Sequence, residues 1–403
     1  MPRPEPPSLE AQLDALLTGR RLGRRELLAL AGTTSLAAFL SACGIKGTPQ
    51  YTLEQLKQRA LKVNHPKVPI GNWTWSNWPL YMDKKILKQF DKTYGGHVKY
   101  VEEINENNDF YGKVRPQLAA GVPIGRDMVV LTDPMALIWV RAGYCEPIDS
   151  RNIPNCRKNL VDNLRNPPWD PGRLYSMPYQ SGVVGIGYDI KQTKRELKSL
   201  KEFFNPEWKG RVTMLGDAQD CLSMVLIMDG KNPTTAPISE YMAAADQLEK
   251  ANKAGQFRRF TGNDYSTDLT KGNIAIAMAW AGDLVQLNSD NPNLRFAYGE
   301  EGSVYWTDNM LLPRHCEHPY AAETMMNFLY EPEVAAQLTE YVNYFSPVKG
   351  VKEILLKKDP DIANNPLIFP PPEAQKGFFL YKALTPIERQ KIERRMAQVI
   401  SGS

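Results

Sequence analysis

Cysteine pairs, histidines and long apolar runs are scarce in this chain of 403 residues. There are five cysteines and no C-x-x-C pair, so nothing supports a zinc knuckle or a thioredoxin-like redox motif. Four histidines leave few candidates for general-base catalysis, and the motifs H-E-x-x-H, G-x-S-x-G and G-x-x-x-x-G-K are all missing. These absences predict a protein that is not an enzyme and that uses no cofactor and no metal.

An excess of charge of one sign is missing as well. The 49 basic residues nearly balance the 45 acidic ones, for a net charge of +4. A nucleic-acid-binding protein usually carries a concentrated basic excess, so this class is excluded. No internal repeat of 20–50 residues occurs, which excludes a solenoid or a propeller. If the protein binds a cation, local carboxylates must hold it, because the global field does not attract it.

The first 43 residues are typical of an export signal. Residues 23–28 (GRRELL) resemble a twin-arginine motif, and the apolar stretch Leu27–Leu40 is shorter than the roughly 20 residues that span a bilayer. The tetrapeptide LSAC, ending at Cys43, resembles a bacterial lipobox, whose cysteine becomes the acylated N-terminus. We therefore expect residues 1–43 to be a lipoprotein signal and residues 44–67 to be a polar tether. Cys43 would anchor the protein to the outer face of the cytoplasmic membrane.

Four cysteines remain after the predicted cleavage, and they are Cys145, Cys156, Cys221 and Cys316. Thiols outside the cytoplasm tend to oxidise. Cys145 and Cys156 would close a short loop, so we expect a disulfide between them. Cys221 and Cys316 are the second expected pair.

Beyond residue 67, short apolar strands alternate with helical stretches, which predicts an α/β fold. Strands are expected at residues 68–75, 97–101, 127–131, 182–188, 211–215 and 274–279. Helices are expected at residues 83–94, 110–120, 238–254, 320–342 (broken at Pro332) and 386–400. The last helix should begin with a capping box, formed by Thr385 and Glu388, with Pro386 at its first position.

Aromatic and acidic residues occur together in four short segments of the sequence. The pairs are Trp78 with Tyr81, Asp217 with Asp220, Trp280 with Asp283, and Trp306 with Asp308. The first three segments follow predicted strands, where open α/β sheets build their ligand sites. Ammonium groups need carboxylates and methylenes need flat apolar walls, so the set suits a flexible organic diamine or triamine. Taken singly, each segment is also explained by core packing or, at Asp217, by a helix cap.

In this order the segments resemble the spermidine/putrescine-binding proteins of bacterial ABC importers. The resemblance runs over residues 68–346 and includes the crossing segment Ser176–Tyr179 and the Glu331–Val334 turn between two helices. It implies a two-lobe type II periplasmic-binding-protein fold, with a double crossing hinge and a central cleft. The implied first lobe comprises residues 68–181 and 308–350, and the second comprises residues 182–307 and 351–403.

The resemblance also implies roles for individual residues. The rings that would enclose the methylenes are those of Trp78, Tyr81, Trp280 and Trp306. The carboxylates that would hold the ammonium groups are those of Asp217, Asp220, Asp283 and Asp308. Thr132 stands where the family often has a serine. The family commonly has an acid where this chain has Leu80, so either Asp133 replaces that charge or the ligand is shorter or differently charged.

The predicted function is that of a monomeric, lipid-anchored receptor that captures a polyamine, putrescine or spermidine, for the permease of an ABC importer. One alternative keeps the receptor and changes the ligand to another organic cation, such as a quaternary amine or a thiamine-like compound. A second alternative is an anchored extracellular hydrolase, for which the catalytic motifs are missing. No nucleic-acid partner is expected.

Overall fold

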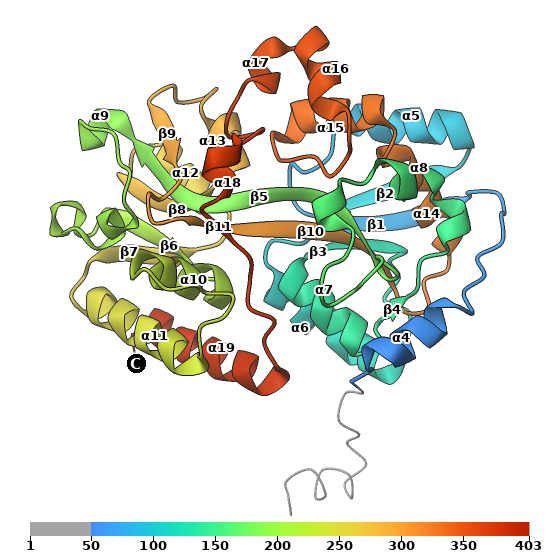
Figure 1. Cartoon of the computed structure of the whole chain (residues 1–403), viewed down its shortest axis with the longest axis horizontal. Helices are drawn as coiled ribbons and strands as arrows, with labels where there is room; N and C mark the ends of the chain where they lie inside the picture. Colours follow the sequence, from blue (N-terminus) through green and yellow to red (C-terminus); the bar gives the residue numbers. More distant parts are fainter. Residues whose placement is uncertain (1–49, 403) are drawn as a thin grey trace, which may run out of the picture. The chain divides into compact units, whose positions relative to one another are not determined.

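A mixed β-sheet runs through the part of the chain that the structure, a computed structural model, describes, which is residues 50–402 (Figure 1). Eleven strands of this part are joined, in the order β2-β1-β3-β10-β5-β8-β6-β7, with β4 and β11 paired to β10 and β9 paired to β5. The strands are β1 (Asn72–Asn77), β2 (His97–Glu102), β3 (Met128–Thr132), β4 (Cys145–Glu146), β5 (Ser176–Asp189), β6 (Val212–Leu215), β7 (Phe257–Thr261), β8 (Ile276–Trp280), β9 (Leu294–Ala297), β10 (Ser303–Pro313) and β11 (Phe378–Phe379). The expected export signal and Cys43 lie outside the described residues.

Two groups of parallel strands flank a long antiparallel pair at the centre of the sheet. In one group β1 pairs with β2 and β3, and in the other β6 pairs with β7 and β8. Between the groups, β5 and β10 run side by side, with β10 also joined to β3 and β5 also joined to β8 (Figure 1). Two strands, β5 and β10, therefore connect the two groups, as the family resemblance implies.

Strand β5 is longer than the sequence indicates. All of its 14 residues are buried, so apolar and polar residues do not alternate along it. The prediction covers only residues 182–188, because the preceding residues include Pro178 and the polar residues Gln180 and Ser181. Pairing with β10 and complete burial override their weak preference for strand.

Helices cover both faces of the sheet (Figure 1). They are α4 (Leu53–Ala60), α5 (Lys84–Tyr94), α6 (Asn107–Ala120), α7 (Asp133–Arg141), α8 (Pro154–Asn159), α9 (Ile190–Thr193), α10 (Ala218–Met228), α11 (Ile238–Lys253), α12 (Tyr265–Thr270), α13 (Ala281–Leu287), α14 (Pro319–Leu329), α15 (Pro332–Val342), α16 (Val351–Lys358), α17 (Pro360–Ala363), α18 (Pro372–Gln375) and α19 (Pro386–Ser401). The predicted capping box of α19 is confirmed, since the Thr385 hydroxyl accepts from the amide of Glu388 and the Glu388 carboxylate accepts from the amide of Thr385. Among residues 50–402, no helix is both long enough and apolar enough to cross a bilayer.

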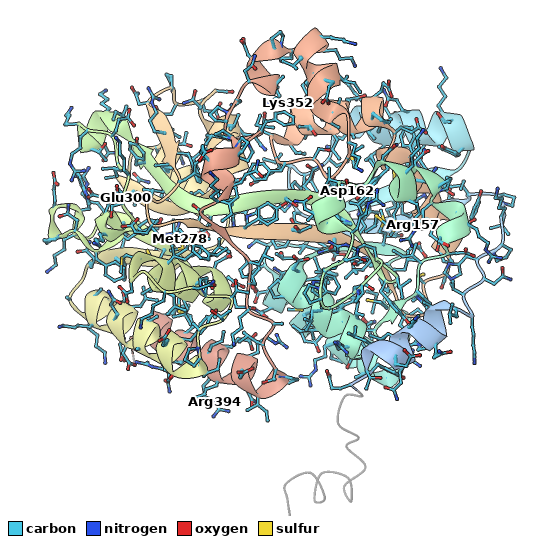
Figure 2. The ribbon with its side chains drawn as sticks, in the orientation of Figure 1. Arg157, Asp162, Met278, Glu300, Lys352 and Arg394 are labelled. Carbon is cyan, nitrogen blue, oxygen red and sulfur yellow. The ribbon has the colours of Figure 1, made fainter. Side chains whose placement is uncertain are left out.

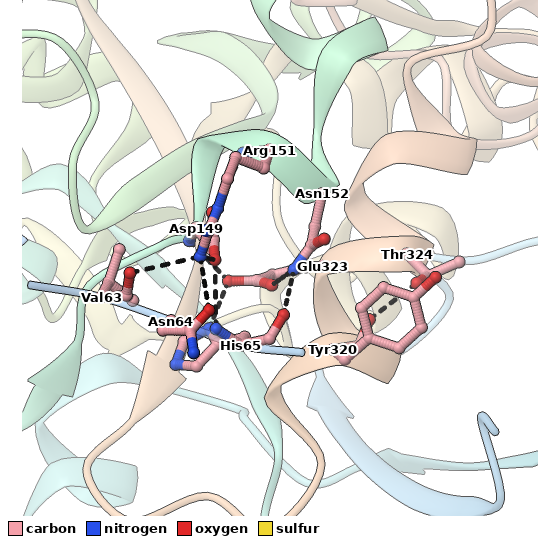
Figure 3. Close-up of polar contacts among 9 residues, drawn as sticks. All are labelled: Val63, Asn64, His65, Asp149, Arg151, Asn152, Tyr320, Glu323 and Thr324. Carbon is pink, nitrogen blue, oxygen red and sulfur yellow. Dashed lines mark hydrogen bonds and ion pairs between the residues drawn. The ribbon is translucent and has the colours of Figure 1, made fainter. Parts of the chain in front are cut away.

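Residues 51–67, expected to be part of a polar tether, instead form α4 and an extended segment bonded to the body of the protein. The imidazole of His65 pairs with the buried carboxylate of Glu323 at 2.7 Å, as Figure 3 shows. The same carboxylate accepts from the backbone amide of Asp149 (2.7 Å) and from the side chain of Asn152 (2.8 Å). Three donors on one buried carboxylate hold this segment in place.

The four cysteines within the described residues are unpaired, so both expected disulfides are wrong. Cys145 lies in β4, whereas Cys156 lies in α8, packs in a different hydrophobic cluster, and donates its thiol to the carbonyl of Met326 (3.3 Å). Cys221 is buried within α10, and Cys316 follows the end of β10. Closeness in sequence does not bring the first two thiols together, because the strand and the helix that carry them pack on different neighbours.

Candidate functional site

A cavity of about 750 Å³ lies where β1, β6, β8 and β10 bring their aromatic and acidic residues together. β1 ends at Asn77, β6 at Leu215 and β8 at Trp280, so the three segments expected beyond strand ends are confirmed in that position. Nine of the ten predicted binding residues line this cavity. They are Trp78, Tyr81, Thr132, Asp217, Asp220, Trp280, Asp283, Trp306 and Asp308.

Asp133, the tenth predicted residue, is not among the residues that line the cavity. Its carboxylate accepts from the side chain of Asn309 at 2.8 Å and is attracted by the buried guanidinium of Arg173. Leu80, at the position where an acid was expected, does line the cavity and is 63% exposed. Asp133 therefore does not supply the missing charge, because the first turn of α7 directs it toward β10 and Arg173.

Aromatic rings form one wall of the cavity. The rings of Trp306 and Tyr344 meet edge to face at 5.2 Å, and those of Tyr81 and Tyr344 meet at 5.6 Å. Two glycines make room for them: a Cβ on Gly182 would lie 2.5 Å from the Trp306 ring, and one on Gly282 would lie 2.6 Å from the Tyr344 ring. Any larger residue at either position would push a ring of this wall out of place.

The indole of Trp78 is held by a hydrogen bond from its Nε1 to the carbonyl of Val130 (3.1 Å). Trp280 packs against Tyr265 with ring centroids 5.8 Å apart, and the Tyr265 hydroxyl accepts from the Trp280 amide (3.0 Å). Both indoles are half-buried and line the cavity. Their positions are thus set by protein contacts, while one surface of each is available to an apolar chain.

Asp308 is the carboxylate with the least complete surroundings. It is 5% exposed, and its Oδ2 accepts from the hydroxyl of Tyr81 (3.0 Å). Its Oδ1 has no hydrogen-bond partner among the described residues, and neither has the Nε1 of neighbouring Trp306. Burial raises the pKa of Asp308 to about 7, although the neighbouring hydroxyls of Thr132 and Tyr81 act in the opposite direction. A buried polar atom without a partner costs free energy, so this oxygen is suited to receive a donor from a ligand.

Asp283 lies beside the same wall but is better satisfied. Its two oxygens accept from the hydroxyls of Tyr265 (2.7 Å) and Tyr344 (2.5 Å). Burial raises the pKa of Asp283 above its ordinary value. Asp283 therefore provides negative charge near the wall, with its geometry set by two tyrosines.

Asp217 and Asp220 form a second acidic group at the start of α10. Asp217 caps this helix, accepting from the amides of Gln219 (2.8 Å) and Asp220 (3.0 Å), so the capping role considered for it is confirmed. The hydroxyl of Tyr381 donates to Asp220. Burial raises the pKa of both carboxyls, and the charge of Asp217 raises that of Asp220 further. A cation placed here would be favoured by both groups.

Several residues that line the cavity are absent from the sequence-based set. They are Glu106, Asp109, Asp264, Tyr344, Tyr381, Arg389 and Glu393, among others. Glu106 caps α6 by accepting from the amide of Asp109 (2.8 Å), and burial followed by the charge of Asp217 raises its pKa to about 7. The sequence offers one signal for Glu106, which is its place directly before a helix, but no signal that this helix faces α10.

Negative charge dominates the cavity. Eight carboxylates line it, those of Glu106, Asp109, Asp217, Asp220, Asp264, Asp283, Asp308 and Glu393. Arg389 is the one basic residue among the lining residues that the structure describes. The near-neutral chain thus concentrates acidic groups in one place, which favours an organic cation as the occupant.

Comparison with known proteins yields a family and several relatives. The sequence pattern of the family described as bacterial extracellular solute-binding protein matches residues 85–370. The chain is 25% identical over 303 residues to the spermidine/putrescine-binding periplasmic protein of Escherichia coli (strain K12), covering 75% of this chain and 84% of that protein. It is 26% identical over 346 residues to the putrescine-binding periplasmic protein PotF of the same strain, covering 81% of this chain and 90% of that protein.

Solved structures show the same architecture. The spermidine/putrescine substrate-binding protein PotD from Streptococcus pneumoniae matches with a TM-score of 0.69 at 23% identity, covering 82% of this chain and 99% of that chain. The TpPotD lipoprotein of Treponema pallidum also matches with a TM-score of 0.69, at 19% identity and with the same coverage. The two-lobe α/β fold and the family resemblance predicted from the sequence are thereby confirmed. Because the matched family consists of solute-binding proteins, the prediction that the chain is not an enzyme is confirmed as well.

Proposed function

This chain belongs to the bacterial extracellular solute-binding protein family, and we propose that it captures a polyamine outside the cytoplasm and delivers it to an ABC importer. Relatives named for spermidine and putrescine support this ligand class. In this proposal the two lobes, residues 68–181 with 308–350 and residues 182–307 with 351–403, close over the ligand. Closure removes water and strengthens each contact between an ammonium and a carboxylate.

The observation that carries the proposal is the open oxygen of Asp308. An ammonium offers three N–H donors and a positive charge, so it can satisfy the Oδ1 of this buried carboxylate. The ring faces of Trp306 and Tyr344 beside it would add a cation–π attraction. An ammonium here would also favour the ionised form of Asp308 and so lower its pKa.

The second acidic group makes a polyamine a better occupant than a cation with one charge. Asp217 and Asp220 follow β6, whereas Asp308 belongs to β10, so the two acidic groups reach the cavity from different strands. One chain with two ammonium groups can pair with both, while its methylenes contact Trp78 and Trp280. A quaternary amine or a thiamine-like cation would leave one group without a partner, which disfavours that alternative.

We also propose that the protein acts as a monomer anchored through a lipid on Cys43. The order of arginines, apolar stretch and cysteine in residues 1–43 supports this. Expression of the wild type and Cys43→Ala in a bacterium, followed by membrane fractionation and mass spectrometry, tests it. We expect an acylated protein in the membrane fraction for the wild type and an unmodified protein for the variant. An unacylated wild type would exclude the anchor.

The ligand class is tested by titrating the protein from Gly44 onward with putrescine, spermidine and choline in a calorimeter. We expect dissociation constants in the micromolar range or below for at least one polyamine, and no measurable binding of choline. Choline stands for the quaternary amines, which place a cation in an aromatic cage without donating hydrogen bonds. Binding of choline alone, or of none of the three, would overturn the proposed function.

A further inference from the structure

The cavity contains one built-in cation, Arg389 of α19. Its side chain is 19% exposed, and its Nη1 donates to Glu393 at 3.0 Å, one turn further along the same helix. A guanidinium has five N–H donors, so this contact leaves most of them available. The family match ends at residue 370, and the segment carrying Arg389 lies beyond it. The match therefore does not account for this arginine.

Arg389 belongs to the acidic group around Asp217. α19 packs against α10, the helix that Asp217 caps, and Arg389 and Asp217 both line the cavity. Burial raises the pKa of Asp217, and the positive charge of Arg389 opposes that rise. Glu106 caps α6 and is in turn affected by the charge of Asp217. The start of α6 and the face of α19 that carries Arg389 both line the cavity, so Arg389 shares it with Glu106, Asp109 and Glu393.

The other end of the cavity has a different environment. The carboxylates of Asp283 and Asp308 accept from the hydroxyls of Tyr265, Tyr344 and Tyr81. No basic side chain within residues 50–402 forms a hydrogen bond or an ion pair with either of them. This end therefore has no cation of its own among the described residues, and an ammonium of the ligand would supply one, whereas Arg389 already brings a positive charge to the other end.

We propose that Arg389 acts as an internal counter-ion that occupies the far end of the cavity and restricts the ligand to a diamine. This inference rests on the proposed function. A diamine would place one ammonium at Asp308 and the other at Asp220, so that it brings no further cation to Arg389. The third ammonium of a triamine would need the place between Glu106 and Glu393, where it would meet the like charge of the guanidinium.

The test compares putrescine with spermidine by calorimetry, in one buffer, for four proteins. For the wild type we expect putrescine to bind at least about tenfold more tightly than spermidine, a difference of about 1.4 kcal/mol. Arg389→Gln removes the charge and should shift this ratio by about tenfold or more toward spermidine. Arg389→Lys keeps the charge and should leave the ratio within about threefold of the wild type.

Arg394→Gln is the matched control, since it removes the same charge from the same helix. Arg394 is exposed, does not line the cavity, and lies at the outer edge of α19 in Figure 2. Its variant should retain the wild-type ratio. A wild type that binds spermidine as tightly as putrescine, or an Arg389→Gln variant with an unchanged ratio, would overturn the role of Arg389. If neither polyamine binds the wild type, the proposed function fails instead.

Discussion

Two buried aspartates in different regions of this protein are satisfied to very different degrees. Asp170, in the loop before β5, is 3% exposed and accepts from the amides of Leu174, Tyr175 and Ser176 at 3.0–3.1 Å and from the Ser176 hydroxyl at 2.8 Å. Asp308, in the cavity, is 5% exposed and has one oxygen without a partner. Both are equally removed from water, so burial alone does not distinguish a structural carboxylate from a binding one. The two kinds of carboxylate differ in the number of hydrogen-bond donors that the protein supplies to them.

Glu323 repeats the pattern of Asp170. It is fully buried and receives donors from His65, Asp149 and Asn152, which together hold the N-terminal segment (Figure 3). A saturated carboxylate stabilises the native state, because every lone pair that loses water gains a donor. A carboxylate with an unpaired oxygen, such as that of Asp308, lowers the stability of the native state, and a ligand that donates to this oxygen supplies the missing hydrogen bond.

The largest expected effect is a loss of stability on removal of Asp170, the carboxylate whose oxygens are fully hydrogen-bonded. Asp170→Ala leaves three backbone amides and the Ser176 hydroxyl without their acceptor and removes a negative charge near the buried guanidinium of Arg173, so we expect a loss of about 3–5 kcal/mol in the free energy of unfolding. Urea unfolding followed by tryptophan fluorescence measures it. Asp162→Ala is the control, because this aspartate has 78% of its side chain exposed and its loss should cost less than about 1 kcal/mol of stability. If Asp170→Ala lowered the free energy of unfolding no more than Asp162→Ala, the stabilising role of the fully hydrogen-bonded Asp170 would be contradicted.

Removal of Asp308, the carboxylate with an unpaired oxygen, should lower the affinity for the ligand rather than the stability of the fold. Asp308→Ala removes the carboxylate that has a free oxygen, and we expect at least about tenfold weaker polyamine binding, about 1.4 kcal/mol or more. The free energy of unfolding without ligand should stay the same or rise. Calorimetric titration and urea unfolding of the same preparation check both parts. Unchanged affinity would discredit the site.

The pKa of Asp308 predicts how the binding depends on pH. The empty site has a pKa of about 7, and the ligand requires the ionised form, so lowering the pH from about 8 to about 6 should weaken binding by about tenfold. Titrations at several pH values on the wild type and Asp308→Asn measure this. The variant should lose most of the dependence, although Glu106, also with a pKa of about 7, contributes some of it.

The raised pKa of Asp308 has the opposite effect on folding: stability decreases as the pH rises, whereas ligand binding becomes stronger. Asp308 holds its proton more tightly in the native protein than in the unfolded chain, so its contribution to stability is complete below about pH 4 and is lost as the pH rises through about 7. Asparagine carries no charge at any pH. Without ligand, Asp308→Asn should therefore gain about 4 kcal/mol over the wild type between about pH 4 and about pH 8, because the pKa of Asp308 rises from 3.8 to about 7 and each unit corresponds to about 1.4 kcal/mol. A difference that does not change with pH would contradict the raised pKa.

The smallest expected effect concerns the aromatic wall. Trp280→Leu keeps an apolar surface and removes the flat ring face against which the ligand's methylenes are proposed to pack, so polyamine binding should weaken by about three- to tenfold. Trp208→Leu, in a buried position outside the cavity, should lower stability and leave the affinity unchanged. Equal affinity of the wild type and Trp280→Leu would show that this ring does not contact the ligand.

Much of the fold could be predicted because its signals are local. The helices at α5, α11 and α19 and the strands β2, β3 and β6 lie within a few residues of the ranges expected from apolar periodicity. Thr385 and Glu388 form their capping box from residues three positions apart. The first half of β5 was missed because its burial depends on β10, more than a hundred residues away in sequence.

The candidate site was predicted where residue type and strand end coincide, as at Trp78, Asp217 and Trp280. It was missed where a residue reaches the cavity through the packing of a distant element. Glu106 and Arg389 belong to helices whose own sequences give no sign that both line one cavity. Asp133 was predicted to bind the ligand because it directly follows a strand. It does not line the cavity, since the first turn of α7 points its carboxylate toward Asn309.

By itself, the sequence determined the α/β class, the order of the aromatic and acidic segments, and the family to which the chain belongs. These properties are carried by neighbouring residues and by their order, which no packing changes. The tertiary structure alone decided which buried carboxylates are saturated and which retain a free oxygen, and it placed Arg389 among the acids. The reason is physical: the donors around each carboxylate come from segments far apart in the chain, and only packing sets their distances.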